Sequence, residues 1–165
     1  MAETRITGGC QCGAVRFALT QQPDNPHICH CRMCQKAFGS FFAPLTGVPL
    51  DRFEVTRGTL STFKSSDLVE RGFCRDCGTP LSFHFVGGNR ISLAIGSLDE
   101  PEKFAPAIQV GNEARLSWFD TLPGLPGRDT TSEQDDPEGT ARIAATNHQH
   151  PDRDTAKWPP AGKAG

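Results

Sequence analysis

Residues 74–78 read CRDCG, and residues 10–13 read CQCG. In each stretch two cysteines stand one or two residues apart, and a glycine follows the second cysteine. Two cysteines at this spacing can bind one zinc ion from a single turn, and glycine can adopt the left-handed conformation that points backbone N–H groups toward the sulfur atoms. We therefore expect both stretches to form one closed zinc site that joins the N-terminal strand to the middle of the chain. Its four ligands are Cys10, Cys12, Cys74 and Cys77.

A third group of cysteines has a different form. Residues 29–34 read CHCRMC, and no glycine follows the group. Three protein ligands and one vacancy are typical of a catalytic zinc, and the three ligands here are Cys29, Cys31 and Cys34. The alternative is a closed site that His27, His30 or His84 completes, although His30 lies between two ligands and is poorly placed to join them. The spacing alone also leaves open a different sorting of the cysteine pairs between the two ions.

The number of cysteines favours metal binding over disulfides. There are seven, an odd number, and they are grouped within a few residues of one another. Residues 1–9 carry no apolar run of the kind found in a signal peptide or a membrane span. We therefore expect a cytoplasmic protein with reduced thiols and two zinc ions per chain.

Alternating apolar residues predict a mainly antiparallel β structure. Residues 15–19, 81–85 and 91–95 each alternate apolar and other side chains with a period of two. The glycines at 87 and 88 predict a tight hairpin between the last two of these strands. Only residues 33–38 suggest a helical turn. The fold class expected from this pattern is all-β.

The C-terminal part of the chain differs from the rest in composition. All 11 phenylalanines lie at or before Phe119, and the only large apolar residues in 126–165 are Ile143 and Trp158. We therefore expect one domain over residues 1–125, followed by a polar, proline- and aspartate-rich tail over residues 126–165 that is solvated and dispensable for folding. His148 and His150 are expected to lie in solvent rather than on a metal ion.

The overall charge limits the possible partners. The net charge is −2 and the isoelectric point is near 6.2, so the chain lacks the basic field that dominates binding to nucleic acids. Small or neutral partners are expected instead.

The cysteine groups and their neighbours resemble one known family. The stretches are GGCQCGAV at 8–15, CHCRMC at 29–34, RGFCRDCGTPL at 71–81 and GSLD at 96–99. Together they are similar to the glutathione-dependent formaldehyde-activating enzymes, a family that includes centromere-protein-V-like proteins, over about residues 5–125. The resemblance implies coiled antiparallel β-sheets, a structural zinc on the four-cysteine set and a catalytic zinc on the three-cysteine set. It also implies carbon–sulfur lyase chemistry, in which glutathione and formaldehyde form S-hydroxymethylglutathione.

The ligand types agree with that chemistry. A zinc ion bound by three thiolates is soft and favours a fourth sulfur ligand, and a substrate thiol held there as thiolate is the nucleophilic form. A small-molecule thiol such as glutathione is therefore the expected partner. Basic residues that could hold its carboxylates flank the open site (Arg32, Lys36) and the closed site (Arg71, Arg75), although each is also an ordinary surface cation.

Aromatic residues and a rival function complete the sequence-based expectations. Phe38, Phe41, Phe42 and Trp118 could line a pocket, although aromatic residues in such positions more often pack in a core. The rival interpretation of the chain is a zinc-stabilised binding module in which both metals are structural. The fourth ligand of the three-cysteine site distinguishes the two interpretations, since a vacancy favours an enzyme and a buried histidine favours a module.

Overall fold

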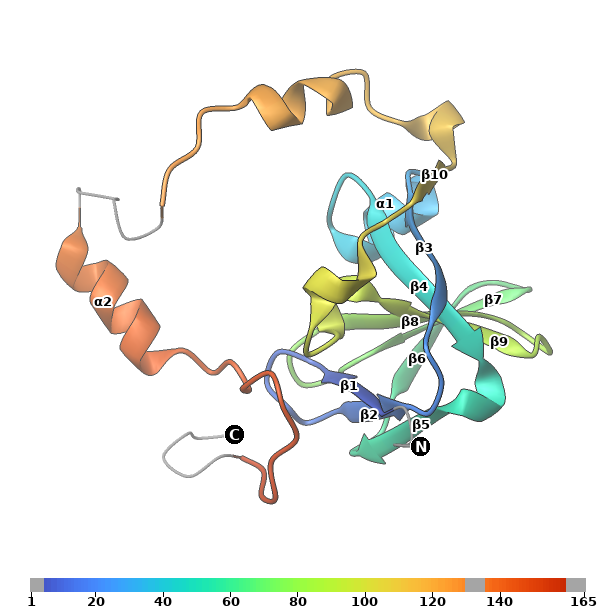
Figure 1. The fold of residues 1–165 in the computed structure, drawn as a ribbon, viewed down its shortest axis with the longest axis horizontal. Coiled ribbons are helices and arrows are strands. Elements are labelled where there is room, and N and C mark those ends of the chain that lie inside the picture. The colour runs from blue at the N-terminus through green and yellow to red at the C-terminus, as the bar shows by residue number, and fades with distance from the viewer. Residues whose placement is uncertain (1–4, 130–135, 160–165) are drawn as a thin grey trace.

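The structure, a computed structural model, describes residues 5–129 and 136–159, and two β-sheets form its body (Figure 1). The smaller sheet has three antiparallel strands in the order β1-β2-β5. Every residue of its central strand is buried, which makes this sheet one wall of the core. The strands are β1 (Ile6–Gly9), β2 (Arg16–Leu19) and β5 (Phe53–Arg57).

The larger sheet has seven strands in the order β10-β3-β4-β9-β8-β7-β6. All neighbours are antiparallel except β10, which runs parallel to β3 at the edge. The predicted all-β, mainly antiparallel class is therefore confirmed. The strands are β3 (Asp24–Cys29), β4 (Ala43–Pro49), β6 (Ser61–Ser66), β7 (Val69–Phe73), β8 (Pro80–Phe85), β9 (Arg90–Ala94) and β10 (Ile108–Val110).

The main core lies where side chains of the two sheets meet. Phe17 and Leu19 of β2 pack in one cluster with Leu81 of β8 and Leu93 of β9, and all four are fully buried. The predicted hairpin between β8 and β9 is present, and Gly87 in its turn has a φ of 76° that favours glycine. The four-cysteine group lies at the border of this core, because Cys10 and Cys74 belong to the same cluster.

The helical turn predicted over residues 33–38 is the helix α1 (Arg32–Phe38). It begins after Cys31, whose sulfur accepts a hydrogen bond from the backbone N–H of Cys34, and it ends at Gly39, which has a left-handed φ of 58°. Five short 3₁₀ turns join other elements within the described residues. They are η1 (Leu50–Arg52), η2 (Ile95–Ser97), η3 (Pro101–Phe104), η4 (Asn112–Ala114) and η5 (Phe119–Gly124).

The tail holds a second helix, α2 (Pro137–Thr146), which was not expected from the sequence. The Asp136 side chain accepts a hydrogen bond from the backbone N–H of Gly139, and Pro137 occupies the first helical position, so the helix begins with two favourable residues. None of its residues is buried. Figure 1 shows α2 on an arc of chain that stands away from the sheets. No helix among the described residues has the length and apolar character needed to cross a membrane.

Beyond α2 the chain returns to the body beside β1 and β2 (Figure 1). His150, expected in solvent, is only 4% exposed, and its backbone N–H donates to the carbonyl of Gln11 at 2.7 Å. The indole Nε1 of Trp158 donates to the carbonyl of Cys12 at 2.8 Å. The expectation of a fully solvated tail was therefore wrong for this returning segment, which we call the docked segment (residues 150–158), while His148 is exposed as expected.

Candidate metal centres

The four thiols of the first group lie together at the border of the core. Their sulfur atoms all lie within 4.8 Å of one another. The sulfur of Cys12 is 3.6 Å from that of Cys10 and 3.9 Å from that of Cys74. Four thiolates around a tetrahedral zinc at about 2.3 Å stand about 3.8 Å apart, so the group has the dimensions of a zinc site. The four sulfurs belong to Cys10, Cys12, Cys74 and Cys77.

The two halves of this group have the same backbone form. The N–H of Cys10 donates to Val15 O at 2.9 Å, and the N–H of Cys74 donates to Thr79 O at 3.0 Å. Gly13 and Gly78 have φ angles of 82° and 76°, in the left-handed region that the sequence predicted for both. Each pair of thiols is thus presented by the same kind of tight turn.

Two thiols of the four-cysteine group have strongly shifted pKa values. Burial raises the pKa of Cys74 to about 11. Burial also acts to raise the pKa of Cys77, but the Thr79 hydroxyl at 3.1 Å and nearby backbone N–H groups favour the thiolate and lower it to about 6. Cys77 therefore favours the thiolate, which is the form that binds a metal ion.

The three thiols of the second group come from the end of β3 and the beginning of α1. Cys29 ends the strand, Cys31 caps the helix and Cys34 lies in its first turn. Their sulfur atoms lie within 4.8 Å of one another. Cys34 is 2% exposed, whereas Cys29 and Cys31 are half-buried, so one side of the group faces outward. Both cysteine groups could hold a metal ion.

No histidine of the described residues belongs to the three-cysteine group. His27 and His84 each have Nδ1 within 3 Å of a backbone carbonyl, those of Asn25 and Arg90. His30 is fully buried with Nε2 2.9 Å from Gln109 Oε1, and its Nδ1 has no partner among the described residues. The three histidines named as possible fourth ligands thus lie outside the group, and this arrangement favours a three-ligand site.

Arg71 was expected to flank the four-cysteine group, but the structure places its guanidinium at the three-cysteine group. Its Nη2 donates to the sulfur of Cys34 at 3.5 Å. Burial acts to raise the pKa of Cys31, but the N–H of Cys34, the neighbouring thiols and the charge of Arg71 together lower it. Arg75, the other residue named at that position, is exposed.

Strand β10 forms a wall of the three-cysteine group. The N–H of His30 donates to the carbonyl of Val110 at 2.8 Å. Gly111 follows with a φ of 69°, and a β-carbon on it would lie 2.7 Å from the backbone nitrogen of Cys31. The role of this glycine could not be predicted from the sequence, because the contact joins residues far apart in the chain.

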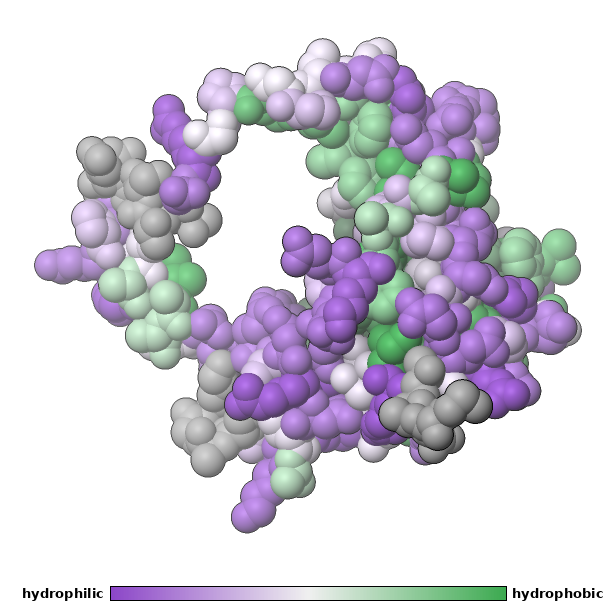
Figure 2. All heavy atoms as spheres, in the orientation of Figure 1, coloured by the Kyte–Doolittle hydropathy of each residue, from purple (hydrophilic) through white to green (hydrophobic). Residues whose placement is uncertain are grey.

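Basic and aromatic residues lie together on the outer side of α1. Arg32 and Lys36 line a groove of about 400 Å³ with Phe41 and Trp118, whose ring centroids are 5.6 Å apart. The pocket-wall alternative for Phe41 and Trp118 is thus consistent with the structure. Figure 2 shows hydrophobic residues gathered in this region, where Figure 1 places β10 and α1.

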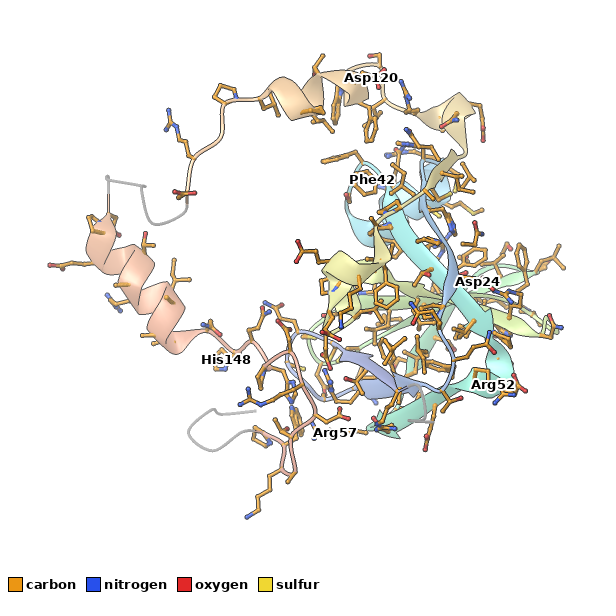
Figure 3. The ribbon with its side chains drawn as sticks, in the orientation of Figure 1. Asp24, Phe42, Arg52, Arg57, Asp120 and His148 are labelled. Carbon is orange, nitrogen blue, oxygen red and sulfur yellow. The ribbon has the colours of Figure 1, made fainter. Side chains whose placement is uncertain are left out.

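Two other aromatic residues lie inside the same region. Phe42 packs edge-on against His30 and Phe119 at centroid distances of 6.2 and 5.9 Å, and Figure 3 shows Phe42 on the loop beside α1. Phe38 packs with Cys34 in a second, smaller core cluster. Both therefore stabilise the surroundings of the thiols.

The docked segment covers part of the four-cysteine group. Arg16, 3% exposed, donates to Asp99 of the body and to Asp154 of the docked segment. Arg57 donates to the carbonyl and the hydroxyl of Thr155, and Figure 3 shows Arg57 beside the returning chain. A cavity of about 450 Å³ lies between this segment and the turn at Cys77 and Gly78. These contacts are polar and have no periodic pattern in the sequence, so they could not be predicted from it.

Comparison with known proteins agrees with this geometry. A family model described as glutathione-dependent formaldehyde-activating enzyme matches residues 5–113. A crystal structure of a Rhodobacter sphaeroides protein aligns with a TM-score of 0.52 and 21% identity, covering 63% of this chain and 99% of that one. At this identity the match shows a shared fold.

Curated relatives match over a shorter region. Proteins of Phaeosphaeria nodorum and Podospora anserina are each 32% identical over 74 residues, and one of Penicillium rubens is 33% identical over 76. All three carry the name "Putative glutathione-dependent formaldehyde-activating enzyme". Each match covers 44% of this chain and 39%, 35% and 40% of the respective relative, so the chain spans well under half the length of these relatives.

Proposed function

Because the chain belongs to the glutathione-dependent formaldehyde-activating enzyme family, we propose that it is a zinc-dependent carbon–sulfur lyase. Its substrates would be a glutathione-like thiol and a formaldehyde-like aldehyde, joined as an S-hydroxymethyl adduct. The observation that carries this proposal is the group of three thiols that no histidine of the described residues completes. An incomplete ligand set is typical of catalytic zinc, whereas structural zinc has four protein ligands.

The two cysteine groups have different proposed roles, one structural and one catalytic. Cys10, Cys12, Cys74 and Cys77 would hold a closed structural zinc, because four thiolates fill its tetrahedron. Cys29, Cys31 and Cys34 would hold the catalytic zinc. In support, the first group offers four thiols and borders the main core, while the second group offers only three.

The residues around the second group provide binding and orientation. A zinc ion there would bind a substrate thiol as its thiolate, the nucleophilic form. Adduct formation then joins that sulfur to the aldehyde carbon while the carbonyl oxygen gains a proton, and the reverse step breaks the same carbon–sulfur bond. Arg32 and Lys36 supply cations for the carboxylates of a glutathione-like thiol, and Phe41 and Trp118 form the apolar part of the groove. Holding both reactants together accounts for much of the expected acceleration.

Two cysteine substitutions and a spectroscopic assay test the proposal. Cys31→Ser should stay folded, retain one zinc by native mass spectrometry and lose thiol–aldehyde exchange. Cys77→Ser should yield unfolded or aggregated protein, because structural zinc contributes folding free energy. With cobalt in place of zinc, glutathione should shift the thiolate-to-cobalt absorption, and S-methylglutathione, which lacks an ionisable thiol, should leave it unchanged.

The opposite results favour a binding module. If glutathione leaves the cobalt spectrum unchanged and Cys31→Ser retains full exchange activity, both metals are structural. Equal damage from the two cysteine substitutions would remove the distinction between the sites.

A further inference from the structure

Arg71 is a buried cation whose surroundings are almost entirely apolar or sulfur. It lies in β7 and is 6% exposed. Its guanidinium carbon is 5.1 Å from the ring centroid of Phe83, the residue opposite it on β8. It also lines a cavity of about 150 Å³ between α1 and β7 with Phe38 and Phe63. Transfer of a charged side chain from water into a buried, apolar environment is unfavourable unless an opposite charge compensates it.

No carboxylate of the described residues provides that opposite charge. None of the ion pairs found within residues 5–129 and 136–159 includes Arg71. Its Nε donates to the neutral hydroxyl of Ser65 at 3.2 Å, and its Nη1 is enclosed without a partner among those residues. The remaining contact is Nη2 with the sulfur of Cys34 at 3.5 Å. The sulfur of Cys34, one of the three thiols, is therefore the partner of this charge among the described residues.

The charges of the proposed site match this arrangement. Three thiolates and one divalent zinc carry a net charge of about −1, and a fourth, thiolate ligand brings this to about −2. This accumulation of negative charge opposes binding of an anionic fourth ligand in a poorly solvated site. A fixed guanidinium at the sulfur of Cys34 offsets one unit of it.

We propose that Arg71 is a positioning residue of the three-cysteine site, whose charge allows the zinc-loaded site to accept an anionic sulfur ligand. The proposal rests on the proposed function for the identity of that fourth ligand. It adds a role for a residue outside the ligand set, and it distinguishes Arg71 from Arg75, which lies next to a cysteine in sequence but is exposed.

A chelator titration of the zinc-loaded full-length chain tests the first half of the proposal. The two zinc ions should leave in separate steps. The step that is missing in the Cys31→Ser variant belongs to the three-cysteine site. Arg71→Met should weaken zinc binding at the three-cysteine site by about 10–100-fold, the usual effect of removing a partner of a metal ligand. Arg71→Lys, which keeps the charge, should recover most of this loss, and Arg75→Met should behave as the parent. Zinc at the four-cysteine site should be unchanged in all three variants.

A comparison of ligands tests the second half. With cobalt in the sites, Arg71→Met should weaken binding of 2-mercaptoethanol as thiolate much more than binding of neutral imidazole. A loss of packing alone would weaken both equally. If Arg71→Met does not fold, Arg71→Gln, which keeps a donor but lacks the charge, takes its place.

Two results would overturn the proposal. One is that Arg71→Met, or Arg71→Gln in its place, has the same zinc affinity as the parent and the same ratio of thiolate to imidazole binding. The other is a lysine variant as weak as Arg71→Met. If instead the parent protein binds no thiol at all, the proposed function fails, and the chelator titration still reports whether Arg71 stabilises the loaded three-cysteine site.

Discussion

The imidazole ring of His150 lies against the α-carbon of Gly13, in the space that a β-carbon at position 13 would fill. Gly13 belongs to the turn that follows Cys12, and its φ of 82° already favours glycine. The docked segment therefore rests on the four-cysteine group at a point where any larger residue would displace it.

Replacing Gly13 and Gly78 by alanine, one at a time, distinguishes the effect of the His150 contact from the effect of the left-handed backbone conformation. Gly78 has nearly the same φ, 76°, but no atom of the described residues lies within 4 Å of the position that its β-carbon would take. Gly78→Ala should destabilise the protein by about 1–2 kcal/mol, the usual penalty for a left-handed alanine. Gly13→Ala should show that loss and also release the docked segment. Trypsin should then cut faster at Arg153 and Lys157 in Gly13→Ala alone, and equal cleavage in both variants would show that His150 does not rest on Gly13.

Truncation of the chain measures how much the docked segment contributes to the free energy of unfolding. Ending the chain after Thr146 removes Asp154 and Thr155, which accept hydrogen bonds from Arg16 and Arg57, and removes Trp158, which donates to the carbonyl of Cys12. Each of these three hydrogen bonds contributes about 0.5–1.5 kcal/mol, so urea unfolding should show a loss of about 1.5–4.5 kcal/mol in the free energy of unfolding. Ending the chain after Gly127 should cost no more, because α2 buries no residue. Full stability after both truncations would restore the expectation of a dispensable tail.

Docking should weaken as the pH falls. Burial lowers the pKa of His150 below its usual value of 6.5, and the charges of Arg16 and Arg57 act in the same direction. The undocked chain then binds more protons than the docked one at pH values between the lowered pKa and about 6.5, so stability rises with pH across that window and is lost below it. Unfolding at pH 7.0, 6.0 and 5.5 should show this slope in the parent and in His148→Gln. A slope that persists in His150→Gln would assign it to another group.

The wall of the three-cysteine group can be tested with another pair of glycines. Gly111 and Gly39 both have positive φ angles, 69° and 58°. A β-carbon on Gly111 would meet the backbone of Cys31, whereas one on Gly39 would meet no atom of the part of the chain that the structure describes. Gly39→Ala should lose about 1–2 kcal/mol and keep both metal ions. Gly111→Ala should in addition weaken zinc at the three-cysteine site in a chelator titration. Normal zinc retention in Gly111→Ala would mean that Cys31 tolerates the shift.

The parts of the site that could be predicted from sequence are those set by short-range spacing. Cys29, Cys31 and Cys34 must lie close together because all three fall within six consecutive residues. A glycine after Cys12 or Cys77 has a local conformational reason. The hairpin at Gly87 is local in the same sense. The helix α2 also had a local signal, Asp136 followed by Pro137, but its lack of an apolar face made it easy to overlook.

The missed features depend on contacts between distant segments. Arg71 is three residues from Cys74, yet its side chain projects from β7 toward the sulfur of Cys34. Alternation along a strand shows that neighbouring residues face opposite ways, but it does not show what each face meets. The docked segment is held by hydrogen bonds and an ion pair to Arg16, for which the sequence has no periodic pattern.

The four-cysteine group joins sulfurs that are 62 residues apart, as those of Cys12 and Cys74 are. At about 5–20 residues per second, a ribosome takes about 3–12 s to add that length. During synthesis the first pair of thiols therefore waits for seconds, exposed and unpaired, before the second pair exists. The long connection makes the start of the chain the part most open to oxidation or to a wrong metal while the protein is being made, and the site can close only when more than 70 residues have been added.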